Sequence, residues 1–260
     1  MNNRLQSLIM GAAICCAPTA VFSQTYYDLA GDADAAIAEG RWKDAATALE
    51  EAMKLRPDNP SNILLMSNLG IIYYNLGEDS LALATLNRAN SLAPKSVTVL
   101  LNRADVLLSL QRENEAYEDL TKIISLDSAL VEPLYDHAML SLRRGDTAQA
   151  LADCNRLKEI APEKIETFIA NGSYHSAIEQ WIDAIPYYTT ALEINPSAKL
   201  YCARAVCYLM LQRLGEASAD ITSGLELDPN DKELYLYRAY LNKMRYLTDD
   251  ARRDLLKALQ

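Results

Sequence analysis

The sequence predicts an all-α protein made of about seven helix-turn-helix repeats. Alanines recur at intervals of 33 to 37 residues, a small residue lies twelve positions before each of them, and a proline or serine lies twelve positions after the first six. A period of this length, kept over seven units, indicates a solenoid of stacked helical pairs. The recurring alanines are Ala45, Ala82, Ala116, Ala150, Ala184, Ala217 and Ala251.

Each unit reads as two amphipathic helices of about twelve to fifteen residues, because apolar residues recur at helical spacing. A turn joins the two helices, and proline near the end of most units stops the second one. The join after the first unit, around Pro57–Pro60, is three residues longer than the others. The turn position is glycine at Gly40, Gly77 and Gly145, and Gln111, Glu179, Gln212 and Tyr246 in the other units. The predicted repeats are 26–59, 63–96, 97–130, 131–164, 165–197, 198–231 and 232–260.

The first residues have the pattern of a secretory signal. Arg4 is the only charged residue in 1–23, an apolar run extends from Leu8 to Phe22, and a small residue, Ser23, precedes the expected cleavage point. We therefore expect a signal peptide at 1–23 and a mature repeat array at 24–260. The apolar run is short for a membrane span, so a retained anchor is the weaker alternative. A bacterial periplasmic or secreted location follows from this prediction.

Composition argues against several classes of function. The chain has 35 acidic and 25 basic residues, a formal net charge of −10, and such a chain lacks the basic face that nucleic acids require. It has two histidines, His137 and His175, and no glycine-rich phosphate loop or Cys-x-x-Cys, so no catalytic site, metal or cofactor is predicted. We expect His175 to be a buried packing residue. The mature cysteines, Cys154, Cys202 and Cys207, read as small apolar side chains, with Cys202 facing the binding surface.

Four of the units share a second correlation. A basic residue just before the small residue of the first helix coincides with an aspartate three positions after the alanine. These pairs are Arg103 with Asp119, His137 with Asp153, Arg204 with Asp220, and Arg238 with Asp254. The other three units have neither member of the pair. Two explanations are open: a contact between the two helices of each unit, or copying of one ancestral unit by duplication.

The repeat resembles the tetratricopeptide repeat family over nearly the whole predicted mature chain. The unit at 63–96 carries most of the family signature, in Leu69, Gly70, Tyr73, Gly77, Ala82, Leu86, Ala89 and Pro94. This resemblance implies a right-handed superhelical solenoid whose first helices line a concave groove that binds a protein or a peptide. It also implies a set of groove residues, which are Asn68, Ile71, Tyr74, Asn102, Asp105, Tyr135, Asp136, Met139, Arg143, Leu209, Met210, Tyr237, Tyr240 and Met244.

Two features of this predicted groove bear on its ligand. Asn68 and Asn102 occupy the same position in successive units, where asparagines of relatives hold the backbone of an extended peptide. The last two units instead offer methionine and tyrosine, which suit an apolar segment unless neighbouring helices cover them. The early grooves lack the lysine and arginine of the carboxylate clamp found in chaperone-binding relatives, so that function is not carried over.

The last predicted helix has an unusual apolar face. Leu256 stands where earlier units have a polar residue, and Leu259 follows it one turn later. We expect either a surface for self-association or docking, or a frayed terminus. The sequence thus predicts a non-catalytic adaptor in the cell envelope that binds an unidentified protein or peptide. The alternative is a structural subunit of an envelope assembly joined through repeat ends, and an enzyme is less expected.

Overall fold

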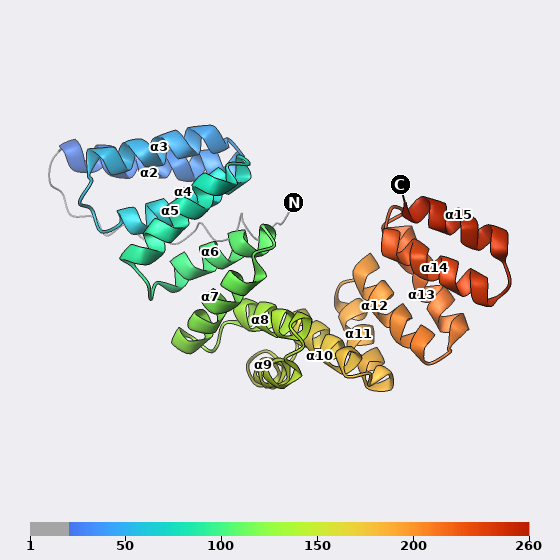
Figure 1. Ribbon diagram of the computed structural model, residues 1–260. Helices are drawn as coiled ribbons and strands as arrows, with labels where there is room; N and C mark the ends of the chain where they lie inside the picture. Colours follow the sequence, from blue (N-terminus) through green and yellow to red (C-terminus); the bar gives the residue numbers. More distant parts are fainter. Residues whose placement is uncertain (1–20, 260) are drawn as a thin grey trace. The chain divides into compact units, whose positions relative to one another are not determined.

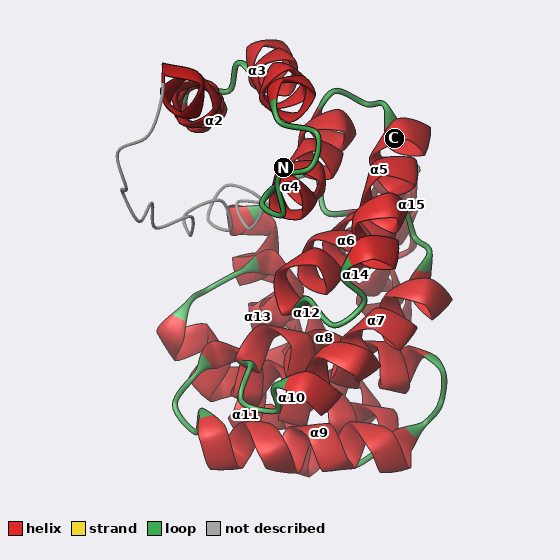
Figure 2. Cartoon of the chain, turned by 90° about the vertical axis from the view of Figure 1, so that its left-hand side faces the viewer, coloured by secondary structure: helices red, strands yellow, loops and turns green. Residues whose placement is uncertain are grey.

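A computed structural model describes the backbone of residues 21–259 and the side chains from Thr25 onward. The predicted signal peptide at 1–23 lies almost wholly outside this range and stays a prediction. The described residues form α-helices and no strand (Figure 2), which confirms the all-α prediction. The helices are α2 (Val21–Ala38), α3 (Trp42–Leu55), α4 (Asn62–Asn75), α5 (Asp79–Leu92), α6 (Val97–Ser109), α7 (Glu113–Leu126), α8 (Val131–Arg143), α9 (Thr147–Ile160), α10 (Ile165–Ala177), α11 (Trp181–Ile194), α12 (Ala198–Met210), α13 (Leu214–Leu227), α14 (Lys232–Met244) and α15 (Thr248–Ala258).

Within residues 21–259, consecutive helices pair into seven hairpins, from α2/α3 to α14/α15, each closed by a short turn (Figure 1). The helices divide into two compact units that meet in sequence between Ser128 and Ala129. The N-terminal unit contains α2 to α7, and the C-terminal unit contains α8 to α15. Within the N-terminal unit α4 packs against both α3 and α6, and within the C-terminal unit α12 packs against α11 and α14. Each hairpin is thus packed on its neighbour in the same unit.

Small residues set how closely the two helices of a hairpin cross. A Cβ atom added to Gly172 would lie 2.8 Å from the ring of Tyr188, and one added to Gly70 would collide with Leu86. The side chains four positions after the recurring alanines therefore fill the space beside each crossing. Six of them, in residues from Leu49 to Ile221, are at most 3% exposed, whereas the seventh, Leu255 of α15, is 47% exposed.

All seven hairpin turns have a residue in the left-handed backbone region, at the position where the sequence alternates between glycine and other residues. Gly40, Gly77 and Gly145 have φ of 71° to 77° there, while Gln111, Glu179, Gln212 and Tyr246 have φ of 59° or 60°. The same two hydrogen bonds close the glycine and non-glycine turns. In α6/α7 the Gln111 N–H donates to Leu108 and the Arg112 N–H donates to Leu107, a Schellman arrangement. The hydrogen bonds of the turn therefore impose the left-handed conformation, whether or not the residue is glycine.

The longer join between α3 and α4 is held by one buried asparagine. The Asn62 amide nitrogen donates to the carbonyls of Arg56 and Pro57, at 2.7 and 3.1 Å. Its amide oxygen accepts a hydrogen bond of 2.9 Å from the Tyr26 hydroxyl of α2. Because the amide nitrogen and the amide oxygen of Asn62 are both hydrogen-bonded, this side chain holds the longer join in a fixed position between α3 and α4.

Candidate binding surfaces

The four predicted pairs are contacts between the two helices of a hairpin. Arg103 makes two hydrogen bonds to Asp119, of 2.6 and 2.5 Å, and Arg204 makes two to Asp220, both of 2.8 Å. Arg238 binds Asp254 at 2.6 and 3.0 Å, and His137 Nδ1 lies 2.7 Å from Asp153 Oδ2. The aspartates are 0 to 5% exposed. The contact explanation is therefore confirmed, and these charges serve hairpin packing.

Two of these arginines also reach the preceding hairpin. Arg103 Nη1 donates to Asn87 Oδ1 on α5 at 2.9 Å, and Arg204 Nη1 donates to Thr189 Oγ1 on α11 at 2.9 Å. Asn87 and Thr189 both lie five positions after their alanine. The same side chain thus fixes its own hairpin and ties it to the one before, which leaves it little freedom to bind a ligand.

The two histidines lie in different environments. His137 is 3% exposed and forms its pair with Asp153. The prediction that His175 is buried is wrong. Its ring stacks on Tyr187 with an interplanar angle of 13°, and its Nδ1 bonds the exposed Gln180 side chain at 2.8 Å. His175 is thus partly exposed, whereas Tyr73, at the same repeat position of α4, is 9% exposed.

The three cysteines in the described part of the chain, Cys154, Cys202 and Cys207, are buried and free. Burial is the main cause that raises the pKa of the Cys154 and Cys202 thiols to about 12, and for Cys202 the nearby Glu233 carboxylate contributes to this value. A thiol with such a pKa is protonated at neutral pH and is a poor nucleophile. Cys202 is only 6% exposed, so the expectation that it faces the binding groove is wrong.

In the N-terminal unit, the predicted groove residues divide between surface and interior. Asn68, Tyr74 and Asp105 are partly exposed, while Ile71 and Asn102 are 3% and 2% exposed. The Asn102 amide nitrogen donates to Ser67 Oγ on α4 at 2.9 Å, and its amide oxygen has no hydrogen-bond partner among the described residues. Asn102 is therefore a link between α4 and α6 and is not open to a peptide. The expected pair of open asparagines is corrected to Asn68 alone.

In the C-terminal unit, the predicted residues form two groups. On α8, Tyr135, Asp136 and Met139 are partly exposed and Arg143 is exposed. On α12 and α14, large apolar side chains reach the surface: Met210 is 55% and Tyr240 is 51% exposed. Leu236 of α14, at 48%, and the partly exposed Tyr237 and Met244 extend this surface, while Leu209 is buried. We call Met210, Leu236, Tyr237, Tyr240 and Met244 the α12/α14 apolar surface.

Comparison with known proteins identifies the repeat. Two sequence profiles described as Tetratricopeptide repeat match the chain, one at residues 36–102 and the other at residues 97–130 and 198–231. This chain contains tetratricopeptide repeats. The solved structure of a tetratricopeptide repeat protein from Parabacteroides merdae ATCC 43184 has the same fold, with a TM-score of 0.78 and 24% identity over 90% of this chain and 92% of that one.

Curated relatives of this tetratricopeptide repeat chain are longer proteins. Human DnaJ homolog subfamily C member 7 is 28% identical over 67% of this chain and 39% of its own length. A UDP-N-acetylglucosamine–peptide N-acetylglucosaminyltransferase of Giardia intestinalis is 30% identical over 38% of this chain and 7% of its own length. The chain thus spans well under half the length of these two curated relatives, and their whole-protein activities do not transfer to it directly.

The end of the tetratricopeptide array has the apolar face that the sequence predicts. Leu256 is 54% and Leu259 is 82% exposed on or beside α15. Leu255 adjoins them at 47% exposure. Whether a second molecule covers this face stays a prediction.

Sequence reasoning missed a hollow in the N-terminal unit. A space of about 520 Å³ lies between α3, α4 and α5, with Met53, Met66 and Leu69 among its lining residues. The only sequence signal for it is the longer join at Pro57–Pro60, because Pro57 is part of its wall. The hollow lies among the second helices α3 and α5, away from the groove residues that the family resemblance implies.

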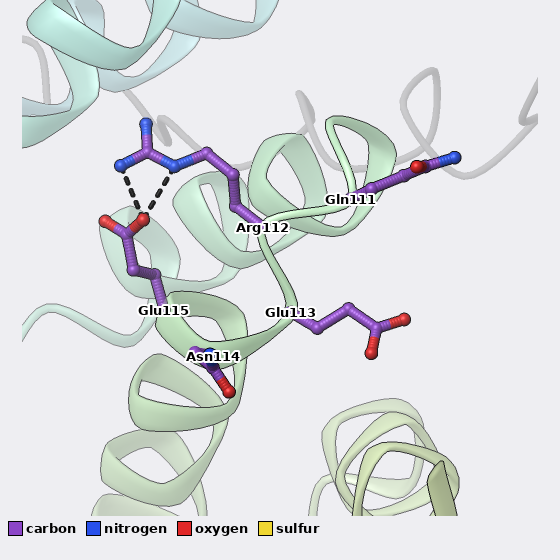
Figure 3. Close-up of a pocket in the computed structure, with 5 residues that line it drawn as sticks. All are labelled: Gln111, Arg112, Glu113, Asn114 and Glu115. Carbon is purple, nitrogen blue, oxygen red and sulfur yellow. Dashed lines mark hydrogen bonds and ion pairs between the residues drawn. The ribbon is translucent and has the colours of Figure 1, made fainter. Parts of the chain in front are cut away.

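Another hollow, of about 550 Å³, lies beside the α6/α7 turn (Figure 3). Figure 3 shows Arg112 turned toward Glu115, with Nε 2.6 Å from Glu115 Oε1, while Gln111 and Glu113 point to the other side. Five consecutive residues line this space, so its polar groups do not converge on one ligand. It carries no catalytic arrangement.

Two further properties of the described residues bear on other kinds of site. They contain no group of three or more histidine, cysteine, aspartate or glutamate side chains placed to hold a metal ion. No helix between residues 21 and 259 combines the length and apolar character needed to cross a membrane.

Proposed function

We propose that this protein is a non-catalytic scaffold in the cell envelope that binds a protein or peptide partner along its first helices. The binding role rests on one observation, the α12/α14 apolar surface, and the envelope location rests on the predicted signal peptide. Three large apolar side chains, Met210, Leu236 and Tyr240, are each about half exposed on two helices that pack side by side. Tyrosine and methionine are favoured in interfaces because both offer a large contact area, and methionine also adapts its shape.

The charges of the N-terminal unit argue against the carboxylate clamp by which some tetratricopeptide repeat proteins bind chaperones. Helix α4 carries no lysine or arginine, and Arg103 of α6 is bound to Asp119 and Asn87. These two helices therefore lack free cations that could grip a partner's carboxylate. We accordingly propose an apolar or amphipathic partner segment for this chain.

A pull-down from the native envelope fraction tests the proposal. Full-length protein is compared with a Met210→Ser/Tyr240→Ser variant and with an Ile182→Ser control, because Ile182 of α11 is 71% exposed but lies outside the α12/α14 apolar surface. We expect the double variant to lose the partner and the control to keep it. Equal recovery by all three proteins would show that the partner binds elsewhere.

A structural subunit of an envelope assembly is the second candidate. The exposed Leu255, Leu256 and Leu259 favour it, because apolar clusters of this kind mark association surfaces. Sedimentation velocity of the wild type and of a Leu256→Glu/Leu259→Glu variant distinguishes the two roles. A larger species that the variant abolishes supports assembly through the α15 end, and a wild-type monomer at high concentration argues against it.

A further inference from the structure

The hollow between α3, α4 and α5 has the features of a ligand site separate from the first-helix surface. Its volume of about 520 Å³ lies within the range of roughly 300 to 1,000 Å³ typical of small-molecule sites. Met66 and Leu69 of α4 are 8% and 4% exposed and form an apolar base, and Met53 of α3 is partly buried beside them. A ligand that enters it would therefore bury an apolar body.

The longer α3/α4 join gives the hollow one of its walls. Pro57 lines it directly, and Asn62, which fixes the backbone of Arg56 and Pro57, lines it as well. Since both bonds of the Asn62 amide nitrogen go to this join, the wall is held open without a ligand. The site is thus preformed, which lowers the entropic cost of binding.

The charged groups at the rim are unequally paired. The Glu50 carboxylate accepts a 2.7 Å hydrogen bond from the Tyr73 hydroxyl and lies 3.6 Å from Lys54 Nζ. Arg88 of α5 also lines the hollow, and no acidic residue in the described part of the chain pairs with its guanidinium. The rim therefore carries two cations and one anion, and the unpaired charge is Arg88.

One polar group of the wall is also unused. The hydroxyls of Thr47, Thr121, Thr189 and Thr222 each donate to the carbonyl four residues earlier in their own helix. Thr85 lines the hollow three residues before Arg88, and its hydroxyl has no such bond in the described structure. An exposed guanidinium and a free hydroxyl one turn apart on α5 are suitable donors to one carboxylate.

We propose that this hollow binds a small amphipathic carboxylic acid, with its apolar body on Met53, Met66 and Leu69 and its carboxylate on Arg88 and Thr85. The shape and the charge argue for the same ligand: the base is apolar, and the one unpaired charge at the rim is positive. The site does not depend on the proposed scaffold function, because none of these residues belongs to the α12/α14 apolar surface.

Methionine-methyl NMR on the full-length protein tests the proposal with octanoate as the probe. The Met53 and Met66 methyl signals, assigned with Met53→Leu and Met66→Leu variants, report on the base of the hollow. We expect saturable shifts of these two signals, and at least fivefold weaker binding of octan-1-ol and of octyltrimethylammonium, because neither gains a charge-assisted bond to Arg88. Equal affinity for the three probes would overturn the proposal.

Variants locate the binding. Arg88→Gln should weaken octanoate binding about fivefold, whereas Lys122→Gln should leave it unchanged, because Lys122 is at the same register on α7 and does not line the hollow. Ala84→Phe, at an exposed position of the wall, should abolish the shifts while the helical circular dichroism stays that of the wild type. Retained shifts in Ala84→Phe would place the octanoate elsewhere.

A peptide arm separates a free acid from a chain terminus. Acetyl-Leu-Leu presents the same carboxylate on a peptide. Binding of this dipeptide at least as tightly as octanoate would assign the hollow to the C-terminus of a protein partner and would refute the free-acid proposal. Binding at least fivefold weaker supports it.

Discussion

The third hairpin, α6/α7, and the fifth, α10/α11, reach the same fold with different side chains at the crossing of their helices. In the third, Arg103 joins Asp119 through two short hydrogen bonds and Asp119 is fully buried. In the fifth, asparagine and tyrosine replace this pair as Asn171 and Tyr187. The ion pair is therefore not required by the repeat, although four of the seven hairpins use a charged or imidazole–carboxylate pair.

The fifth hairpin fixes its crossing with an aromatic ring. Tyr188 is 3% exposed and lies against Gly172, and its hydroxyl bonds Ser173 and Ser176 of α10 at 3.4 and 3.3 Å. Asn171 is buried, and its amide oxygen has no hydrogen-bond partner among the described residues. Both hairpins thus have a small residue at the helix crossing, whereas the polar side chains beside the crossing differ between them.

Loss of the ion pair in the third hairpin should have the largest effect. Arg103→Ala leaves the buried Asp119 carboxylate without its cation, so we expect the free energy of unfolding to fall by about 3 to 5 kcal/mol. Urea unfolding followed by circular dichroism measures the change. Arg112→Ala removes a more exposed arginine, whose side chain is 43% exposed, and should change stability little. Equal losses in the two variants would contradict a special role for the buried pair.

The same pairs show how far sequence reasoning reaches. Arg103 and Asp119 are sixteen residues apart in a repeat whose period was visible, so register pointed to a contact between them, although it left duplication of one ancestral unit as an equal explanation. The seven hairpins were predictable for the same reason. Register also located the turn residues Gln111 and Glu179, which take the glycine position in the backbone. Features that follow the repeat period could therefore be predicted from the sequence.

Features that depend on one particular neighbouring side chain could not be predicted from the sequence. Asn102 has the sequence position of a groove residue, but its burial depends on Ser67 of α4 lying opposite. His175 has a packing position in the register, but its ring stacks on Tyr187 near the surface. The hollow beside Pro57 follows from how a longer join is held, which residue counting does not reveal. The proposed groove residues that are partly exposed stay predictions until a partner is found.

The glycine of the fifth hairpin should rank second in effect. Gly172→Ala places a methyl group 2.8 Å from the Tyr188 ring, so we expect a loss of about 1 to 3 kcal/mol in the free energy of unfolding. Gly215→Ala on α13 is the matched control, because, apart from its chain neighbours and the backbone of its own helix, nothing lies within 4 Å of an added Cβ there. Thermal and urea unfolding of both variants measure the difference. A destabilised Gly215→Ala would mean that helical glycines matter here for reasons other than packing.

Transplanting the pair tests whether the fifth hairpin can adopt the solution of the third. Asn171→Arg and Tyr187→Asp, made separately and together, form a double-mutant cycle. We expect each single variant to be destabilised and the coupling between them to recover about 1 to 2 kcal/mol, because neighbouring opposite charges interact. A coupling near zero would show that Tyr188 leaves no room for the arginine geometry of α6/α7.

The turns should give the smallest effect, and an equal one in both hairpins, because they are the feature that the third and the fifth share. Gln111 and Glu179 both have φ of 59°, where a residue with a Cβ atom is strained and glycine is not. Gln111→Gly and Glu179→Gly remove this strain but give the unfolded chain more freedom, so the net gain should be about 0.5 to 1 kcal/mol in each case. Gly145→Ala, at φ of 75° in the α8/α9 turn, should lose stability by a similar amount. Urea midpoints of the three variants measure these changes. If Gln111→Gly and Glu179→Gly changed the stability in opposite directions, the turn would be coupled to the helix crossing. The two hairpins would then differ in more than the presence or absence of the buried ion pair.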